Sequence, residues 1–239
     1  MLRKLLFAAL LALCAQASAA QTSGNRTEDN QTTDSLCHEV LLETTAGNIR
    51  IALSDETPLH RDNFLRLVRS GFYDGVLFHR VIPQFMVQAG DSASRHAKPG
   101  VLLGGTPESY TVPAEIRYPK LFHRYGAVAA AREGDEVNPQ RASSASQFYI
   151  VTGQVYDDYN LDRRQQRLDE LTGGAVKLTR DVREVYKTEG GAPHLDGTYT
   201  VFGQVTEGMD AVEIIQWAER DANNRPISDI RILRASVVR

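Results

Sequence analysis

Short apolar runs separated by turn residues dominate the pattern along this 239-residue chain. Residues 40–44 and 48–53 are two such runs, and Thr45-Ala46-Gly47 between them suits a tight turn. This arrangement predicts a β-hairpin near the start of the folded part. Further strands are predicted at 76–82, 85–89, 127–131, 147–152, 198–205 and 227–238.

Two other stretches repeat apolar residues at helical spacing. The first has Thr57 at a favoured N-cap position, Pro58 at the first helical position and Gly71 near its end. The residues that would face the core are Phe64, Leu67, Val68 and Phe72. The second helix is predicted over 209–217, with apolar residues at 209, 212 and 215.

Many short strands with two helices suggest a mainly β fold, a closed barrel capped by the helices. Closure would leave no strand edge exposed. Residues 153–193 interrupt this order, because they are strongly charged and carry apolar residues at helical spacing on either side of Gly173-Gly174. We expect an inserted helical hairpin there, which is either a surface decoration, the interpretation we favour, or an arm that grips substrate.

The N-terminus has the features of an export signal. Arg3 and Lys4 precede an apolar run over 5–15, and Ala17-Ser18-Ala19 forms a small-x-small cleavage pattern. The run is shorter than the ~20 residues that span a bilayer. We therefore expect a signal peptide over 1–19, cleavage near Ala19/Ala20 and a periplasmic or secreted protein. A lipoprotein signal at Cys14 is less favoured, because a bulky leucine precedes that cysteine.

Beyond the signal, residues 20–36 are polar and predict a flexible linker to a domain over 37–239. Cys37 is then the only cysteine of the mature chain, so no intrachain disulfide is expected. The full chain has 27 basic and 30 acidic residues, and removing Arg3 and Lys4 leaves 25 against 30. This charge does not favour nucleic-acid binding. Without a zinc-type cysteine pair, P-loop or dinucleotide fingerprint, the sequence predicts no metal and no cofactor.

Residues 78–91, FHRVIPQFMVQAGD, combine two apolar strands with a guanidinium and an amide. Met86 and Gln88 are two positions apart, so a strand places both on one face. A guanidinium beside apolar side chains is a permanent hydrogen-bond donor in a site that excludes water. A plain surface charge on a barrel strand is the competing interpretation of Arg80.

This motif closely resembles the signature of the cyclophilins, the peptidyl-prolyl cis-trans isomerases. Three further segments resemble the family in the same order: GAVAAAR at 126–132, SQFYI at 146–150 and LDGTYTVFG at 195–203. The resemblance covers roughly 40–238 apart from the charged helical segment. It implies an eight-stranded antiparallel barrel closed by two helices, with the active groove on its outer face. It also implies that proline-containing polypeptides, unfolded or partly folded, are the partners of a monomeric protein.

The resemblance assigns Arg80 to donate to the prolyl nitrogen and Gln88 to orient the substrate carbonyl and support the arginine. Ala131 and Arg132 match the loop that binds the peptide backbone through its main chain. His79, although inside the motif, is assigned to packing. The residues implied to form the proline pocket or line its groove are Phe85, Met86, Gln147, Tyr149, Leu195 and Tyr199.

Three positions depart from the family pattern. Tyr149 stands where well-known members have Phe, Tyr199 replaces a His beside the pocket, and His194 replaces a Trp at the groove edge. The last change argues against tight cyclosporin binding. Two other function classes stay open at this point: a barrel that grips proline-containing loops without turnover, and a small-ligand-binding barrel of the lipocalin kind.

Overall fold

The computed structural model describes residues 38–238. The predicted signal peptide, the linker, Cys14 and Cys37 lie outside the described residues. The strands are β1 Glu39–Thr44, β2 Gly47–Leu53, β3 Arg80–Ile82, β4 Met86–Ala89, β5 Thr111–Val112, β6 Ala127–Ala130, β7 Ser143–Ser144, β8 Phe148–Val151, β9 Val201–Glu207 and β10 Ile232–Val237. The helices are α1 Pro58–Arg69, α2 Asp158–Thr172, α3 Arg180–Thr188 and α4 Met209–Gln216, with short 3₁₀ turns η1 Ser92–His96 and η2 Pro193–Leu195.

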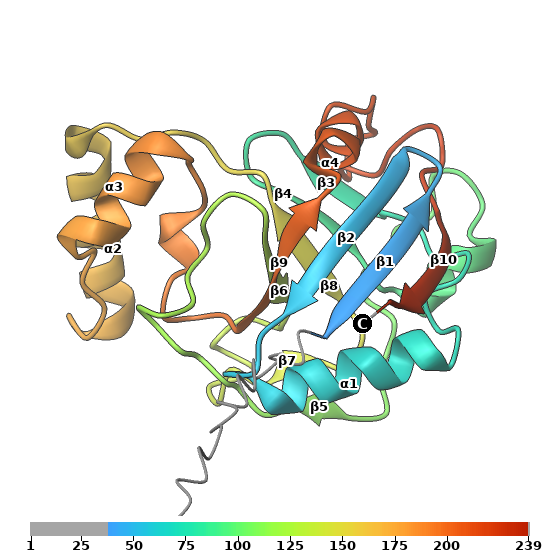
Figure 1. Ribbon diagram of the computed structural model, residues 1–239, viewed down its shortest axis with the longest axis horizontal. Coiled ribbons are helices and arrows are strands. Elements are labelled where there is room, and N and C mark those ends of the chain that lie inside the picture. Colours follow the sequence, from blue (N-terminus) through green and yellow to red (C-terminus); the bar gives the residue numbers. More distant parts are fainter. Residues whose placement is uncertain (1–37, 239) are drawn as a thin grey trace, which may run out of the picture. The chain divides into compact units, whose positions relative to one another are not determined.

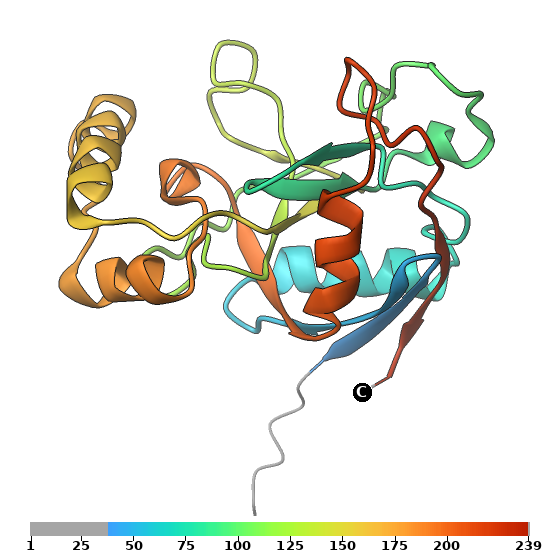
Figure 2. The same ribbon diagram turned by 90° about the horizontal axis from the view of Figure 1, so that it is seen from above.

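Eight strands form one antiparallel sheet that curls into a barrel-like wall (Figure 1). Their order is β10-β1-β2-β9-β6-β8-β4-β3, and β5 pairs with β7 in a separate two-stranded sheet. Helix α1 lies at one end of the curled sheet and α4 at the other (Figures 1 and 2). The mainly β fold with two end helices is therefore as predicted.

The closed barrel predicted from the sequence is wrong, because the sheet is open between β3 and β10. Before β3, an isolated bridge between Leu77 and Arg231 and three backbone hydrogen bonds join residues 75–78 to residues 230–232. Further along β3, the Val81 N–H donates instead to the carbonyl of Asn224, at 2.8 Å. The loop before β10 thus takes the position where a barrel-closing strand would continue, and it satisfies the exposed strand edge.

The main apolar core fills the inside of the curled sheet. Side chains from β1, β2, β4, β6, β8, β9 and β10 meet the buried faces of α1 and α4 there. Phe64 of α1 contacts Tyr73, Phe148 and Phe202, with ring centroids 5.0–5.4 Å apart. A barrel filled in this way does not match the ligand-binding interior expected for the lipocalin alternative.

Helix α1 begins as predicted but is capped differently. Thr57 is the N-cap residue, yet its side chain makes no capping hydrogen bond. The buried carboxylate of Glu115 instead accepts from the N–H groups of Leu59 (3.2 Å) and His60 (3.0 Å). The same carboxylate accepts from Nδ1 of His60 at 2.7 Å. A residue far along the chain therefore satisfies the first turn of the helix.

The sheet is buried on both faces along β4, β6 and β8. Val87 and Ala89 of β4 point into the main core, whereas Met86 and Gln88 point outward. Met86 belongs to a second apolar cluster on the outer face, with Ala127, Ala129, Tyr149, Val151, Ala192 and Val201. The alternation follows from the two-residue period of a strand. It places an apolar floor on the outside of the sheet.

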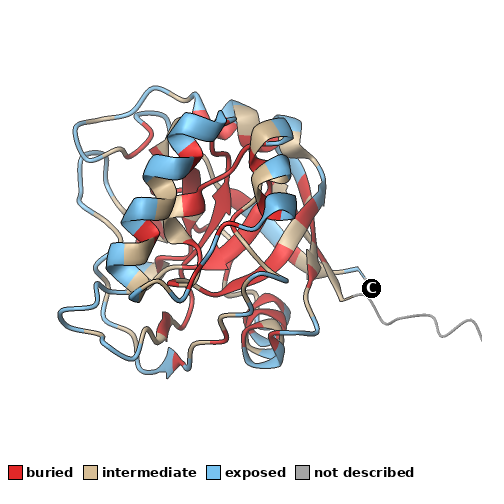
Figure 3. Ribbon diagram, turned by 90° about the vertical axis from the view of Figure 1, so that its left-hand side faces the viewer, coloured by how far each residue is buried: buried red, intermediate tan, exposed pale blue. Residues whose placement is uncertain are grey.

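Between β8 and β9 the chain forms α2 and α3, and we refer to residues 153–193 as the α2–α3 segment. Its helices bury an apolar stripe and expose charged faces (Figure 3). They share a third apolar cluster with two aromatic residues that precede β6, Tyr118 and Phe122. No helix among residues 38–238 is both long and apolar enough to cross a membrane.

Candidate active site

The β3–β4 hairpin aligns polar and aromatic side chains in a row across the outer face. Arg80 of β3 is directly opposite Gln88 of β4, and Gln88 is opposite Tyr149 of β8. Directly cross-strand side chains on one face lie close together. The strand register thus brings Arg80, Gln88 and Tyr149 to one place.

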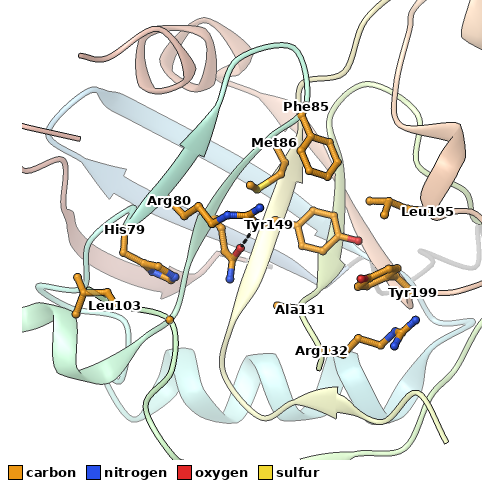
Figure 4. A pocket seen from close by; sticks show the side chains of 12 residues that line it. His79, Arg80, Phe85, Met86, Leu103, Ala131, Arg132, Tyr149, Leu195 and Tyr199 are labelled. Atoms are coloured by element: carbon orange, nitrogen blue, oxygen red, sulfur yellow. Dashed lines mark hydrogen bonds between the residues drawn. The ribbon is translucent and has the colours of Figure 1, made fainter. Parts of the chain in front are cut away.

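A hollow of about 280 Å³ opens beside this row (Figure 4). It is close to the lower end of the ~300–1,000 Å³ typical of small-ligand sites. Its walls are apolar or aromatic on one side, with the arginine on the other. The residues that line it are His79, Arg80, Phe85, Met86, Gln88, Leu103, Gly104, Ala131, Arg132, Tyr149, Leu195 and Tyr199.

Arg80 is half-buried at the edge of the hollow, and an amide is its hydrogen-bond partner. Its Nη1 donates to Oε1 of Gln88 at 3.1 Å. Within residues 38–238 no carboxylate forms an ion pair with it. Burial lowers the pKa of Arg80 from its usual value, but a guanidinium stays charged in a protein. The side chain therefore keeps N–H donors for a ligand in the hollow.

A chain of amides holds Arg80 in place from behind. Nε2 of Gln88 donates to Oε1 of Gln147 at 3.1 Å, and Nε2 of Gln147 donates to the carbonyl of Gly104 at 3.0 Å. The Gly104 N–H in turn donates to the carboxylate of Asp91 at 2.5 Å. Gln147 is not among the residues that line the hollow, but it bonds to two residues that do, Gln88 and Gly104, so its expected place along the groove stays a prediction.

The apolar wall combines fully and partly buried side chains. Met86 and Tyr149 are 1% and 5% exposed, while Phe85 and Leu195 are partly exposed above them. The additional hydroxyl of Tyr149 bonds to Nε2 of the buried His123 at 3.0 Å. A tyrosine at this position is therefore satisfied without reaching into the hollow.

Arg132 and Tyr199 form the far rim. The Arg132 guanidinium lies over the Tyr199 ring at 4.3 Å from its centroid and pairs with Asp135 at 2.6 Å. The Arg132 side chain is only 4% exposed, and its main chain makes no backbone hydrogen bond within the described part of the chain. Ala131, in contrast, already uses its N–H and C=O on Gln147 and Ser144. Of the two residues expected to bind a peptide backbone, Arg132 has both main-chain groups free of backbone partners among the described residues.

Comparison with known proteins agrees with this geometry. Residues 39–237 match the family model described as cyclophilin type peptidyl-prolyl cis-trans isomerase/CLD. The chain belongs to the cyclophilin-type peptidyl-prolyl cis-trans isomerase family. The predicted membership and the predicted enzyme class are confirmed at this level.

This cyclophilin is similar to bacterial relatives in sequence and to solved cyclophilin structures in fold. A Staphylococcus saprophyticus protein, provisionally named a peptidyl-prolyl cis-trans isomerase, is 32% identical over 202 residues, which are 84% of this chain and 91% of that protein. A Cryptosporidium parvum cyclophilin structure is 22% identical with a TM-score of 0.58, covering 84% of this chain and 97% of that one. A second structure of that protein, at 21% identity and a TM-score of 0.57, was obtained in the presence of the dipeptide Ala-Pro, and the match covers 83% of this chain and 98% of that one.

Sequence reasoning missed part of the site of this cyclophilin. Leu103 and Gly104 line the hollow, although their Gly- and Pro-rich stretch gave no sign of a site beyond being a loop. His79 also lines it, and neither of its ring nitrogens has a hydrogen-bond partner within the described residues. Among residues 38–238 no group of acidic, histidine or cysteine side chains is arranged to hold a metal ion.

Proposed function

We propose that this protein is an exported prolyl isomerase that accelerates cis–trans interconversion of X-Pro bonds in folding polypeptides. The observation that carries the proposal is the half-buried Arg80, held by Gln88 beside an apolar hollow. The α2–α3 segment is, in this proposal, an insertion into the family fold. Slow proline isomerisation limits the folding of many chains, so folding polypeptides are fitting substrates.

The reaction needs no covalent step. The X-Pro bond turns slowly because amide resonance imposes a barrier of about 18–20 kcal/mol. Shortening a ~100 s process to ~1 ms requires lowering that barrier by roughly 7 kcal/mol. The nitrogen lone pair becomes available only as the amide twists. A donor aimed at that nitrogen therefore stabilises the transition state more than the ground state.

The site offers two things that this mechanism needs, an apolar wall for the proline ring and a hydrogen-bond donor for the prolyl nitrogen. Phe85, Met86 and Leu195 offer an apolar wall for the pyrrolidine ring, opposite the arginine. Arg80 has N–H groups beyond the one bonded to Gln88, and these would face the prolyl nitrogen. The wall excludes water, which strengthens the interaction. Gln88 would orient the substrate carbonyl, and the free main chain of Arg132 would bind the peptide backbone.

The test is an isomerisation assay on a short X-Pro peptide. Replacing one such donor typically lowers kcat by about 10²–10³-fold, so we expect that loss in Arg80→Ala. Arg80→Lys keeps the charge but loses the planar fork, so we expect it to stay well below wild type. Arg234→Ala, at an exposed arginine on β10, is the matched control and should keep full activity. A wild-type protein without activity would favour a binding module instead, and an equally active Arg80→Ala would contradict the role of Arg80.

Export is supported by the sequence of residues 1–19 alone. The mature chain, isolated from the source cells and sequenced from its N-terminus, should begin at or near Ala20. Recovery of the chain from the cytoplasm with residues 1–19 still attached would contradict the export proposal without affecting the isomerase proposal.

A further inference from the structure

Two walls of the proline pocket are attached to a buried polar network outside the barrel. Leu195 lies at the end of η2, and the next residue, Asp196, is completely buried. Asp196 Oδ1 accepts from the N–H of His123 at 2.9 Å and lies 3.0 Å from Nδ1 of the same residue. On its other side the His123 ring bonds to the hydroxyl of Tyr149. The chemistry fixes the ring orientation, since a carboxylate can only accept and Nδ1 must donate.

The second oxygen of this carboxylate is bonded by the α2–α3 segment. The hydroxyl of Tyr186, on α3, donates to Oδ2 of Asp196 at 2.7 Å. Tyr186 is completely buried, and its ring packs on Phe122 in the third apolar cluster. A buried carboxylate needs donors on both oxygens, because an unsatisfied one is costly. Tyr186 thus provides a bond that the barrel strands do not supply.

The backbone around this network is tied to the same segment. The Ala192 N–H donates to the carbonyl of His123 at 2.8 Å, and the Tyr125 N–H donates to that of Gly190 at 3.1 Å. Gly191 fits so tightly that an added Cβ would lie 2.2 Å from the His123 carbonyl oxygen and 2.6 Å from the Tyr186 ring. The end of α3, the chain around His123 before β6, and η2 therefore pack against one another as one unit.

We propose, on the basis of the isomerase function above, that Tyr186 is a positioning residue for the proline pocket. It acts through Asp196 to hold Leu195, and through Asp196 and His123 to hold the Tyr149 ring. The α2–α3 segment therefore completes the pocket of the barrel and is not a surface decoration. Tyr186 itself touches no substrate.

The experiment measures kcat and KM separately on a short X-Pro peptide for Tyr186→Phe, which keeps the ring and removes the hydroxyl. The pocket wall contacts the proline ring of the substrate equally in the ground state and in the transition state. Loosening the wall therefore weakens the binding of both states to the same extent, which raises KM and leaves kcat unchanged. We expect KM to rise about tenfold, with kcat within threefold of wild type. A merely destabilising change would reduce the active fraction, lowering apparent kcat at unchanged KM.

Tyr118→Phe is the matched control. Its hydroxyl also bonds the α2–α3 segment, at the Lys177 carbonyl 2.7 Å away, but makes no hydrogen bond to Asp196 or His123 among the described residues. We expect its KM to stay within twofold of wild type. In a Tyr149→Phe background, Tyr186→Phe should raise KM less than it does alone, because the link through His123 is already broken.

Equal KM values for Tyr186→Phe, Tyr118→Phe and wild type would overturn the proposal. If Tyr186→Phe does not fold, Val182→Ala replaces it as the test, because it loosens α3 without touching Asp196. We expect this variant also to raise KM. An unchanged KM in Val182→Ala would overturn the proposal as well. Activity in wild type that Arg80→Ala abolishes would leave the isomerase proposal intact in either case. An inactive wild type would instead refute the function on which this inference depends.

Discussion

At the scale of single residues, the arginine proposed to act in the site has a neutral partner. Arg80 bonds an amide, and that amide is bonded by a second one from Gln147. A carboxylate partner would compete with the substrate for the guanidinium donors, whereas an amide orients the side chain and leaves its charge available. The motif around Arg80 and Gln88 was sufficient to predict the first of these contacts.

The supporting layer was harder to predict from residue identities. Gln147 was expected at the groove; it bonds to Gln88, but it is not among the residues that line the hollow. His123 gave no signal and Asp196 only its place in the LDGTYTVFG segment, because the contact between them depends on segments that meet only after folding. Tyr149 was the useful clue, since a buried hydroxyl must find a partner.

His79 makes the stability of the fold depend on pH. Its ring is 3% exposed, and burial lowers its pKa to about 4, against a smaller opposing effect of the Asp91 carboxylate. The unfolded chain takes up this proton near pH 6.5, whereas the folded protein does so only near pH 4. The contribution of the neutral His79 side chain to the free energy of unfolding is therefore fully present above about pH 6.5. It decreases as the pH falls from there towards pH 4.

We expect the free energy of unfolding to fall by about 1–2 kcal/mol between pH 7 and pH 5 because of this histidine. Urea titrations at the two pH values measure it. His79→Gln should show a correspondingly smaller decrease, while His96→Gln, at an exposed histidine, should follow wild type. An unchanged pH dependence in His79→Gln would contradict the assignment.

At the scale of secondary-structure elements, local patterns located most helices and strands but not what stabilises their ends. Helix α1 starts at Pro58 and is followed by Gly71 with φ of +68°, as its sequence indicated. Strand β3, in contrast, is limited to Arg80–Ile82 although the apolar run begins at 76. Pairing with neighbouring chain, not the length of the apolar run, decides where a strand begins.

The cap of α1 gives a prediction at this scale. Glu115→Ala would leave two backbone N–H groups and the Nδ1 atom of His60 without their acceptor. We expect the free energy of unfolding to fall by about 3 kcal/mol or more, measured in urea at pH 7. Thr57→Val, at the residue the sequence marked as the cap, should cost less than about 1 kcal/mol. The reverse order would mean that Thr57 caps the helix in solution.

At the scale of the whole described domain, the fold has three apolar clusters. Two of them lie on the two faces of the sheet, and the third lies between the α2–α3 segment and the chain before β6. The family resemblance predicted the antiparallel eight-stranded sheet and the outer-face site. It overstated closure, because whether the last strand pairs with β3 depends on the loop around Asn224. It also could not show how the charged segment is attached.

Removing that segment tests its place in the molecule. Gln154 and Gly191 exchange backbone hydrogen bonds of 3.1 and 3.3 Å, so an Asn-Gly turn can replace residues 155–190. We expect lower thermal stability, because the third cluster is lost, and reduced activity on both a short X-Pro peptide and an unfolded protein substrate. Full activity on both would identify a decoration, and loss on the protein substrate alone would identify a client-binding arm.

Strands β1 and β10 carry a further consequence. They are neighbours in the sheet, and the Val238 N–H donates to the Glu39 carbonyl at 2.9 Å, on the wall opposite β8. A few linking residues could therefore connect the two ends of the described domain into a continuous loop, with new termini opened at the exposed Gly173 between α2 and α3. Circular permutation of this kind would rearrange the order of synthesis while leaving every side chain around the hollow in place.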